Sequence, residues 1–141
     1  MEQFRACVQK HRSISYVLGI GFLVFINCCG FPILNLSKEW PLMMTATQIY
    51  VVFAGALFSG AILAGLFPKK KFVVVAAADF AAIAMGLVCR YLLEFGEASN
   101  TYNFTIPNTL LHIGIFLFLS MLVWFTTERK GSAGTRHSGN A

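Results

Sequence analysis

The fold is decided by residues 48–93, which read QIYVVFAGALFSGAILAGLFPKKKFVVVAAADFAAIAMGLVCRYLL. Two apolar runs, 48–67 and 72–93, are joined only by the tetrapeptide PKKK at residues 68–71. At a rise of about 1.5 Å per residue, a helix of this length crosses the ~30 Å hydrocarbon core of a bilayer. Barrel strands would instead alternate in polarity over roughly ten residues. The stretch therefore predicts two membrane-spanning helices joined by a three-lysine turn.

Composition extends this prediction to the whole chain of 141 residues, which is 57% hydrophobic and only 12% charged. A soluble domain carries about 25% charged residues, because its surface must face water. Two further apolar runs flank the central pair, and the first is longer than the roughly 7–15 residues of a signal-peptide core. We therefore expect an all-α polytopic membrane protein, a bundle of four transmembrane helices with spans at residues 15–34, 48–67, 72–93 and 108–127.

The distribution of positive charge predicts the orientation of the bundle. If both ends of the chain and the lysine turn share one side, that side holds nine of the eleven basic residues, namely Arg5, Lys10, Arg12, Lys69, Lys70, Lys71, Arg129, Lys130 and Arg136. Short cytosolic segments carry such an excess of Lys and Arg. The N- and C-termini are therefore expected in the cytosol, residues 1–14 as a short tail and the Gly/Ser-rich residues 128–141 as a disordered one.

Small side chains suggest how the spans pack. Apolar burial does not drive helix association in lipid, so close approach of the backbones must. Small residues recur at every fourth position of both central spans, as Ala56, Gly60 and Ala64 on the second and as Ala78, Ala82 and Gly86 on the third. We expect these two ridges to form the tightest contact of the bundle. The fourth span is rich in Phe, Leu and Met, which favours a face toward lipid or a partner.

Asp79 is an acidic residue deep within a predicted span. A charged side chain there costs about 2.5–3.5 kcal/mol and usually faces the bundle interior. Ser59 and Ser120 are predicted at a similar depth, so both can hydrogen-bond it. Asp79 is then either a proton or cation site, a contact for a basic residue of another subunit, or a protonated residue whose hydrogen bonds set the register of the helices.

A second polar group is predicted in the lumenal half, consisting of Asn27, Cys28, Cys29, Cys89, Arg90 and His112. Arg90 is expected to reach the interface and pair with Glu94, four residues on. Either Cys28 or Cys29 pairs with Cys89, or Cys and His bind a metal or haem, or the thiols are free and the His is structural. One His supplies at most one axial ligand, and no close-spaced ligand motif occurs. We expect no metal and no cofactor.

Two candidate modification sites lie outside the spans. Cys7 stands in a basic segment next to the membrane, where a cysteine is either palmitoylated or left as a free thiol. Asn103 begins the glycosylation acceptor Asn103-Phe104-Thr105 on the predicted lumenal side. The acceptor favours a eukaryotic source and a location in the endomembrane system or the plasma membrane.

The layout of the chain resembles the small tetraspan proteins of the MARVEL type. The resemblance rests on four spans with cytosolic ends, a very short basic turn between spans two and three, and the segment KFVVVAAADF at residues 71–80. The segment IYVVFAG at residues 49–55, which opens the second span, is similar to small Golgi tetraspan proteins associated with vesicle coats. Neither resemblance carries functional residues over to this chain.

The sequence favours a non-enzymatic tetraspan scaffold or accessory subunit in membrane trafficking or complex assembly. Its polar loops are too short to form a domain, and no catalytic constellation stands out. Its expected partners are the lipid bilayer and other membrane proteins, reached through the fourth span or the small-residue faces, and not nucleic acid. The alternative is a small transport or redox subunit of a larger membrane complex that uses Asp79 or His112.

Overall fold

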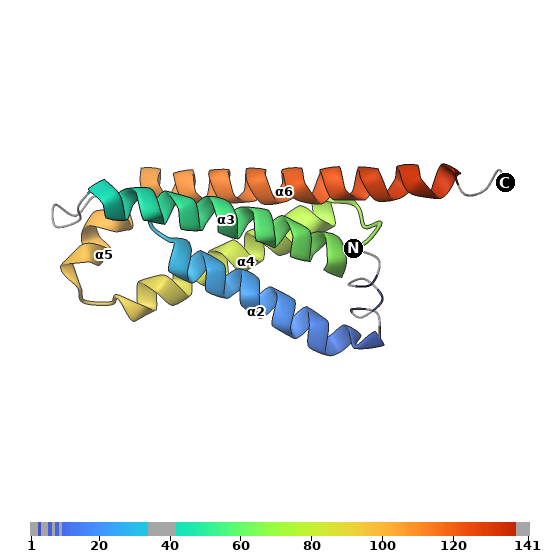
Figure 1. Cartoon of the computed structure of the whole chain (residues 1–141). Helices are drawn as coiled ribbons and strands as arrows, with labels where there is room; N and C mark the ends of the chain where they lie inside the picture. Colours follow the sequence, from blue (N-terminus) through green and yellow to red (C-terminus); the bar gives the residue numbers. More distant parts are fainter. Residues whose placement is uncertain (1–2, 4–5, 7, 9, 34–41, 138–141) are drawn as a thin grey trace.

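The structure is a computed structural model that describes residues 3, 6, 8, 10–33 and 42–137 (Figure 1). Within these residues the elements are all helical, and they are α2 (Arg12–Gly30), α3 (Leu42–Leu66), α4 (Phe72–Leu93), α5 (Ala98–Asn103) and α6 (Ile106–His137). In this part of the chain, four helices are long and apolar enough to cross a membrane: α2, α3 from Gln48, α4, and α6 as far as Arg129. The short helix α5 lies in the loop between α4 and α6.

The helix bounds differ from the predicted spans at one informative place. α4 coincides with residues 72–93, but α2 ends at Gly30 rather than continuing to residue 34. Phe31 has extended backbone angles, φ −83° and ψ 141°. The cause is Pro32, because a proline ring clashes with a helical residue before it. The prediction from hydropathy extended the first span past Pro32, because the residues there are apolar. In the structure the helix ends before Pro32, because the proline ring prevents Phe31 from being helical.

The C-terminal segment also differs from the prediction. Residues 128–141 were expected to be disordered, but α6 continues as one helix to His137. Extending an existing helix fixes one residue per hydrogen bond, and Glu128 and Arg129 are good helix formers. Two contacts stabilise the helix where the segment 128–141 begins. The carboxylate of Glu128 accepts a hydrogen bond from the Lys69 backbone N–H at 3.0 Å, and the Arg129 guanidinium lies 4.2 Å from the ring centre of Phe125.

The four long helices form a ring in the order α2, α4, α6, α3 (Figure 1). The most extensive contacts join α3 to α6 and α2 to α4, whereas α3 and α4 do not form a substantial contact within the described residues. The expectation that spans two and three would make the tightest contact was therefore wrong. Each small-residue ridge faces another helix instead, and α3 and α4 lie across the ring from each other.

Two glycines show how close these contacts are. A Cβ atom on Gly60 of α3 would stand 2.4 Å from the backbone oxygen of Ser120 in α6. A Cβ atom on Gly86 of α4 would stand 2.7 Å from the backbone oxygen of Val24 and 2.6 Å from the Cβ atom of Asn27, both in α2. Contacts this short exclude any side chain. These positions require glycine because two backbones meet there.

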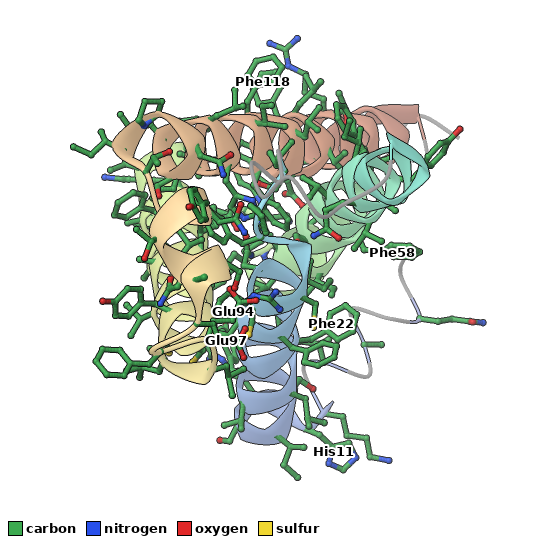
Figure 2. All side chains as sticks on the ribbon, turned by 90° about the vertical axis from the view of Figure 1, so that its left-hand side faces the viewer. His11, Phe22, Phe58, Glu94, Glu97 and Phe118 are labelled. Carbon is green, nitrogen blue, oxygen red and sulfur yellow. The ribbon has the colours of Figure 1, made fainter. Side chains whose placement is uncertain are left out.

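Apolar side chains fill the bundle in two clusters and also cover its outside. One cluster, toward the lysine turn, centres on Leu23, Leu63, Val75, Met121 and Trp124, and the other on Phe31, Val52, Ile83, Leu87 and Phe116. Figure 2 shows Phe22, Phe58 and Phe118 pointing outward from α2, α3 and α6, and all three are exposed. Because a protein surface in water avoids large contiguous apolar areas, this exterior indicates a membrane protein.

We predict that Gly60→Ala destabilises the bundle by about 1–3 kcal/mol, the usual cost of overpacking. The gain in helix propensity of up to about 1 kcal/mol from Gly to Ala does not offset a clash with backbone atoms. Gly114→Ala is the matched control, because a Cβ atom on Gly114 meets nothing within 4 Å. Thermal unfolding of both purified variants in mild detergent measures the difference. Equal melting temperatures would show that α3 and α6 are not in close contact.

Candidate functional site: two buried polar bridges

The buried polar side chains form two separate bridges between helices. Asp79 of α4 and Ser120 of α6 form one, and Asn27 of α2 and His112 of α6 form the other. All four side chains are fully buried. Ser120 and His112 are eight residues apart on α6, so the bridges are separated by about 12 Å along the helix axis. They are two sites at different depths.

The first bridge joins α4 to α6. The Ser120 hydroxyl donates to Oδ2 of Asp79 and also lies 3.1 Å from the backbone carbonyl of Leu117. One hydroxyl hydrogen serves only one of these acceptors at a time. If the Asp79 carboxyl is neutral, it donates to the Ser120 oxygen, and Ser120 donates to Leu117. A neutral carboxyl therefore satisfies both hydroxyl contacts and removes the cost of a buried charge.

Ser59 does not join this bridge, although the sequence placed it at the same depth. It is fully buried, but its hydroxyl donates to the Gly55 carbonyl of its own helix at 2.8 Å. The reason lies in the helix order. α3 lies across the ring from α4, so Ser59 and Asp79 are on helices that do not pack against each other.

The second bridge joins α2 to α6 across the other half of the bundle. Nδ2 of Asn27 donates to the Leu23 carbonyl at 2.9 Å, so Oδ1 of Asn27 is free to accept. Nε2 of His112 lies 3.1 Å from that oxygen and must be the donor. The imidazole packs between the rings of Phe31 and Phe116, whose centres are 5.5 Å and 5.7 Å away. These contacts fix both the orientation and the tautomer of His112.

Each bridge leaves one buried polar atom without a hydrogen bond to the described part of the chain. These atoms are Oδ1 of Asp79 and Nδ1 of His112. Buried polar atoms are usually paired, so both are candidate points for a proton or cation. No cluster of three or more His, Cys, Asp or Glu side chains suited to a metal occurs among the residues that the structure describes.

The other predicted site residues lie outside the bridges. Arg90 forms the expected ion pair with Glu94. Cys28, Cys29 and Cys89 are free thiols. Cys7, the candidate for palmitoylation, lies outside the described residues.

Asn103 is positioned by a folded loop rather than by an open one. It belongs to α5 and is only 2% exposed, and its carbonyl accepts a hydrogen bond from the side chain of Asn108 at 2.9 Å. A glycan on Asn103 would require its side chain to leave this position. The sequence showed the acceptor motif but gave no sign that the loop folds over it.

Sequence reasoning missed, among other contacts, a polar contact between Gln48 and the end of α2. Nε2 of Gln48 lies 2.7 Å from the Gly30 carbonyl and 3.1 Å from the Cys29 carbonyl. Carbonyls at a helix C-terminus lack intrahelical partners, so Gln48 of α3 completes the end of α2. The only signal in the sequence was a polar residue at the start of an apolar run, directly after a polar loop.

Comparisons with protein-family models, with curated proteins and with solved structures find no match to this chain.

We predict that Ser120→Ala lowers the stability of the bundle by about 1–2 kcal/mol, because Asp79 then loses its interhelical partner. Ser59→Ala is the matched control, since Ser59 bonds only within α3 and its loss should cost less than about 0.5 kcal/mol. Unfolding of both variants by SDS in mixed micelles provides the comparison. A larger loss for Ser59→Ala would show that the bridge has been assigned to the wrong serine.

Proposed function

We propose that this chain is a non-enzymatic tetraspan membrane protein that acts as a scaffold or accessory subunit, holding other membrane proteins through an external groove on α4 and α6. The support is the contrast between the interior and the exterior of the bundle. The polar bridges are buried and connect the helices to one another. Gly60 and Gly86 also pack against other helices of the same bundle, so they do not offer a surface to a partner.

The groove is the single observation that carries this proposal. It has a volume of about 520 Å³ and is lined by apolar side chains of both helices, among them Phe72, Ala76, Leu117, Phe118 and Leu122. Gly114 lies in it with open space above its Cα atom. Small residues between large ones allow a further helix to approach closely, which is how helices associate in lipid. A transmembrane helix of a partner protein fits this surface.

The bundle is proposed to have both ends in the cytosol. The start of α2, the lysine turn and the distal part of α6 lie at one end of the bundle (Figure 1), so the basic residues that they carry are grouped. The positive-inside bias then directs this end to the cytosol. Membrane trafficking in the endomembrane system or at the plasma membrane remains the setting that we propose.

The orientation is tested with tags before Met1 and after Ala141 in sealed vesicles of known sidedness. Protease applied from the cytosolic side should remove both tags, since an even number of spans returns the chain to the same face. A tag inserted between α5 and α6 is the internal control and should be protected. Protection of one terminal tag and not the other would exclude a four-span bundle.

The partner groove is tested with Gly114→Leu in the full-length protein. A leucine there should fill the groove and lower the recovery of co-purifying membrane proteins by about tenfold or more, a loss of about 1.4 kcal/mol in binding. Gly21→Leu is the matched control, because Gly21 of α2 also has open space around it but lies away from the groove. Quantitative mass spectrometry after purification in mild detergent measures both.

A photo-crosslinking residue in place of Phe118 supplies an independent measurement in intact cells. It should crosslink to a membrane protein that Gly114→Leu releases, whereas the same residue in place of Phe25, exposed on α2, should not. If Gly114→Leu and Gly21→Leu behave alike, the groove does not hold a partner.

A transport subunit is the second candidate function, and the unpaired Oδ1 of Asp79 favours it. Asp79→Asn keeps a group that can hydrogen-bond Ser120 but cannot exchange a proton in the physiological range. On the scaffold proposal this variant should retain its fold and its partners. Proton uptake into reconstituted vesicles, lost in Asp79→Asn while the melting temperature is unchanged, would instead support transport.

A further inference from the structure

A cavity at the lysine-turn end lies between the start of α2 and the end of α3. Its volume is about 370 Å³, and it is lined by Arg12 and Tyr16 of α2, by Leu66 of α3, and by Pro68 and Lys70 of the turn. Val8 also lines the cavity, and its side chain is buried. Cavities of about 300–1,000 Å³ are the usual size of small-molecule sites.

The walls of this cavity are held by specific contacts. Leu66 is the last residue of α3, so its carbonyl lacks an intrahelical partner. The Tyr16 hydroxyl donates to that carbonyl at 2.7 Å, and the Tyr16 ring meets the Phe67 ring edge to face at 5.4 Å. The Arg12 guanidinium lies 5.7 Å from the centre of the Tyr16 ring. Arg12 is thereby directed along the wall that Tyr16 forms.

The charge of the cavity is positive. Arg12 and Lys70 line it from two different elements, and Lys69 and Lys71 stand on either side of Lys70. Lys69 has a positive φ of 55°, which belongs to the tight turn on which the three lysines are presented. Glu128, the acidic residue bonded to this turn, lies on the Lys69 backbone N–H and does not line the cavity.

We propose that this cavity binds the phosphate-bearing headgroup of an anionic phospholipid, with Arg12 and Lys70 as its cationic ligands. A guanidinium binds two phosphate oxygens at once, and an ammonium adds a compact positive charge. The cavity lies where α2 begins and α3 ends, and both positions are ends of candidate membrane spans, which is the depth of lipid headgroups. Basic pockets between such helices favour anionic lipids.

The apolar part of the site favours a lipid over a free anion. Leu66 and Val8 form one wall, and Val17 and Leu18, next to Tyr16 on α2, are 73% and 67% exposed on the outside of the bundle. A lipid with its phosphate between Arg12 and Lys70 would lay its acyl chains along this outer surface. Free phosphate would use only the charged part of this surface.

The test measures lipid binding to the full-length protein in phosphatidylcholine nanodiscs, to which phosphatidylserine is added in steps. Nanodiscs expose both faces, so the result does not depend on the proposed orientation or on the partner groove. Lys70→Gln should weaken binding about fivefold, the effect of one basic residue near an anionic surface. Arg12→Gln with Lys70→Gln should weaken it by about twentyfold or more, if the two charges act independently.

Lys71→Gln is the matched control, because it removes the same charge from the same turn but does not line the cavity. It should weaken binding less than twofold. Equal losses for Lys70→Gln and Lys71→Gln would overturn the site and leave only diffuse attraction. Binding of inorganic phosphate or glycerophosphoserine at the affinity of the lipid would overturn the assignment to lipid. Melting temperatures of all variants show whether each remains folded.

Discussion

The bundle depends on backbone contacts at two glycines, and each glycine meets a residue of a polar bridge. Gly60 lies against the backbone of Ser120, whose hydroxyl bonds to Asp79, and Gly86 lies against Asn27, whose amide bonds to His112. Close packing and hydrogen bonding thus operate at the same two points. In a membrane, lipid would supply neither hydrogen bonds nor a hydrophobic driving force between helices, so paired contacts of this kind would hold the bundle together.

The inner and outer faces of α6 differ in what they contact. Each bridge reaches α6, Asp79 from α4 and Asn27 from α2, while Gly60 brings α3 to the same helix. α6 is therefore the element on which the other three converge. Its opposite face carries Phe118 and Leu122, which remain exposed and available to lipid or to a partner. The proposed groove uses that outer face without disturbing the bridges.

The two ends of the bundle are also built differently. At the lysine-turn end, Tyr16 of α2 donates a hydrogen bond to the Leu66 carbonyl, and Glu128 of α6 accepts one from the Lys69 N–H. Both α2 and α6 therefore stabilise the turn between α3 and α4. At the opposite end, aromatic rings run in contact from Tyr91 through Phe104 and Phe31 to His112. One end therefore groups cations around a cavity, and the other groups aromatic rings next to α5. The proposed lipid site follows from the cations and the cavity at the lysine-turn end.

The sequence by itself determined the helical class, the number of apolar spans, the basic turn and the residues that must be buried, because run length and polarity are local properties of the chain. It identified Asp79, Ser120, Asn27 and His112 as polar residues within the apolar spans and Arg90 as the partner of Glu94. Only the tertiary structure decided that Ser120 and not Ser59 meets Asp79, and that Gly60 faces α6 rather than α4. The physical reason is that a helix carries small residues and a serine on fixed faces, but which neighbour meets each face depends on the order of helices around the bundle. That order is set by the fit of whole surfaces, which no single span encodes.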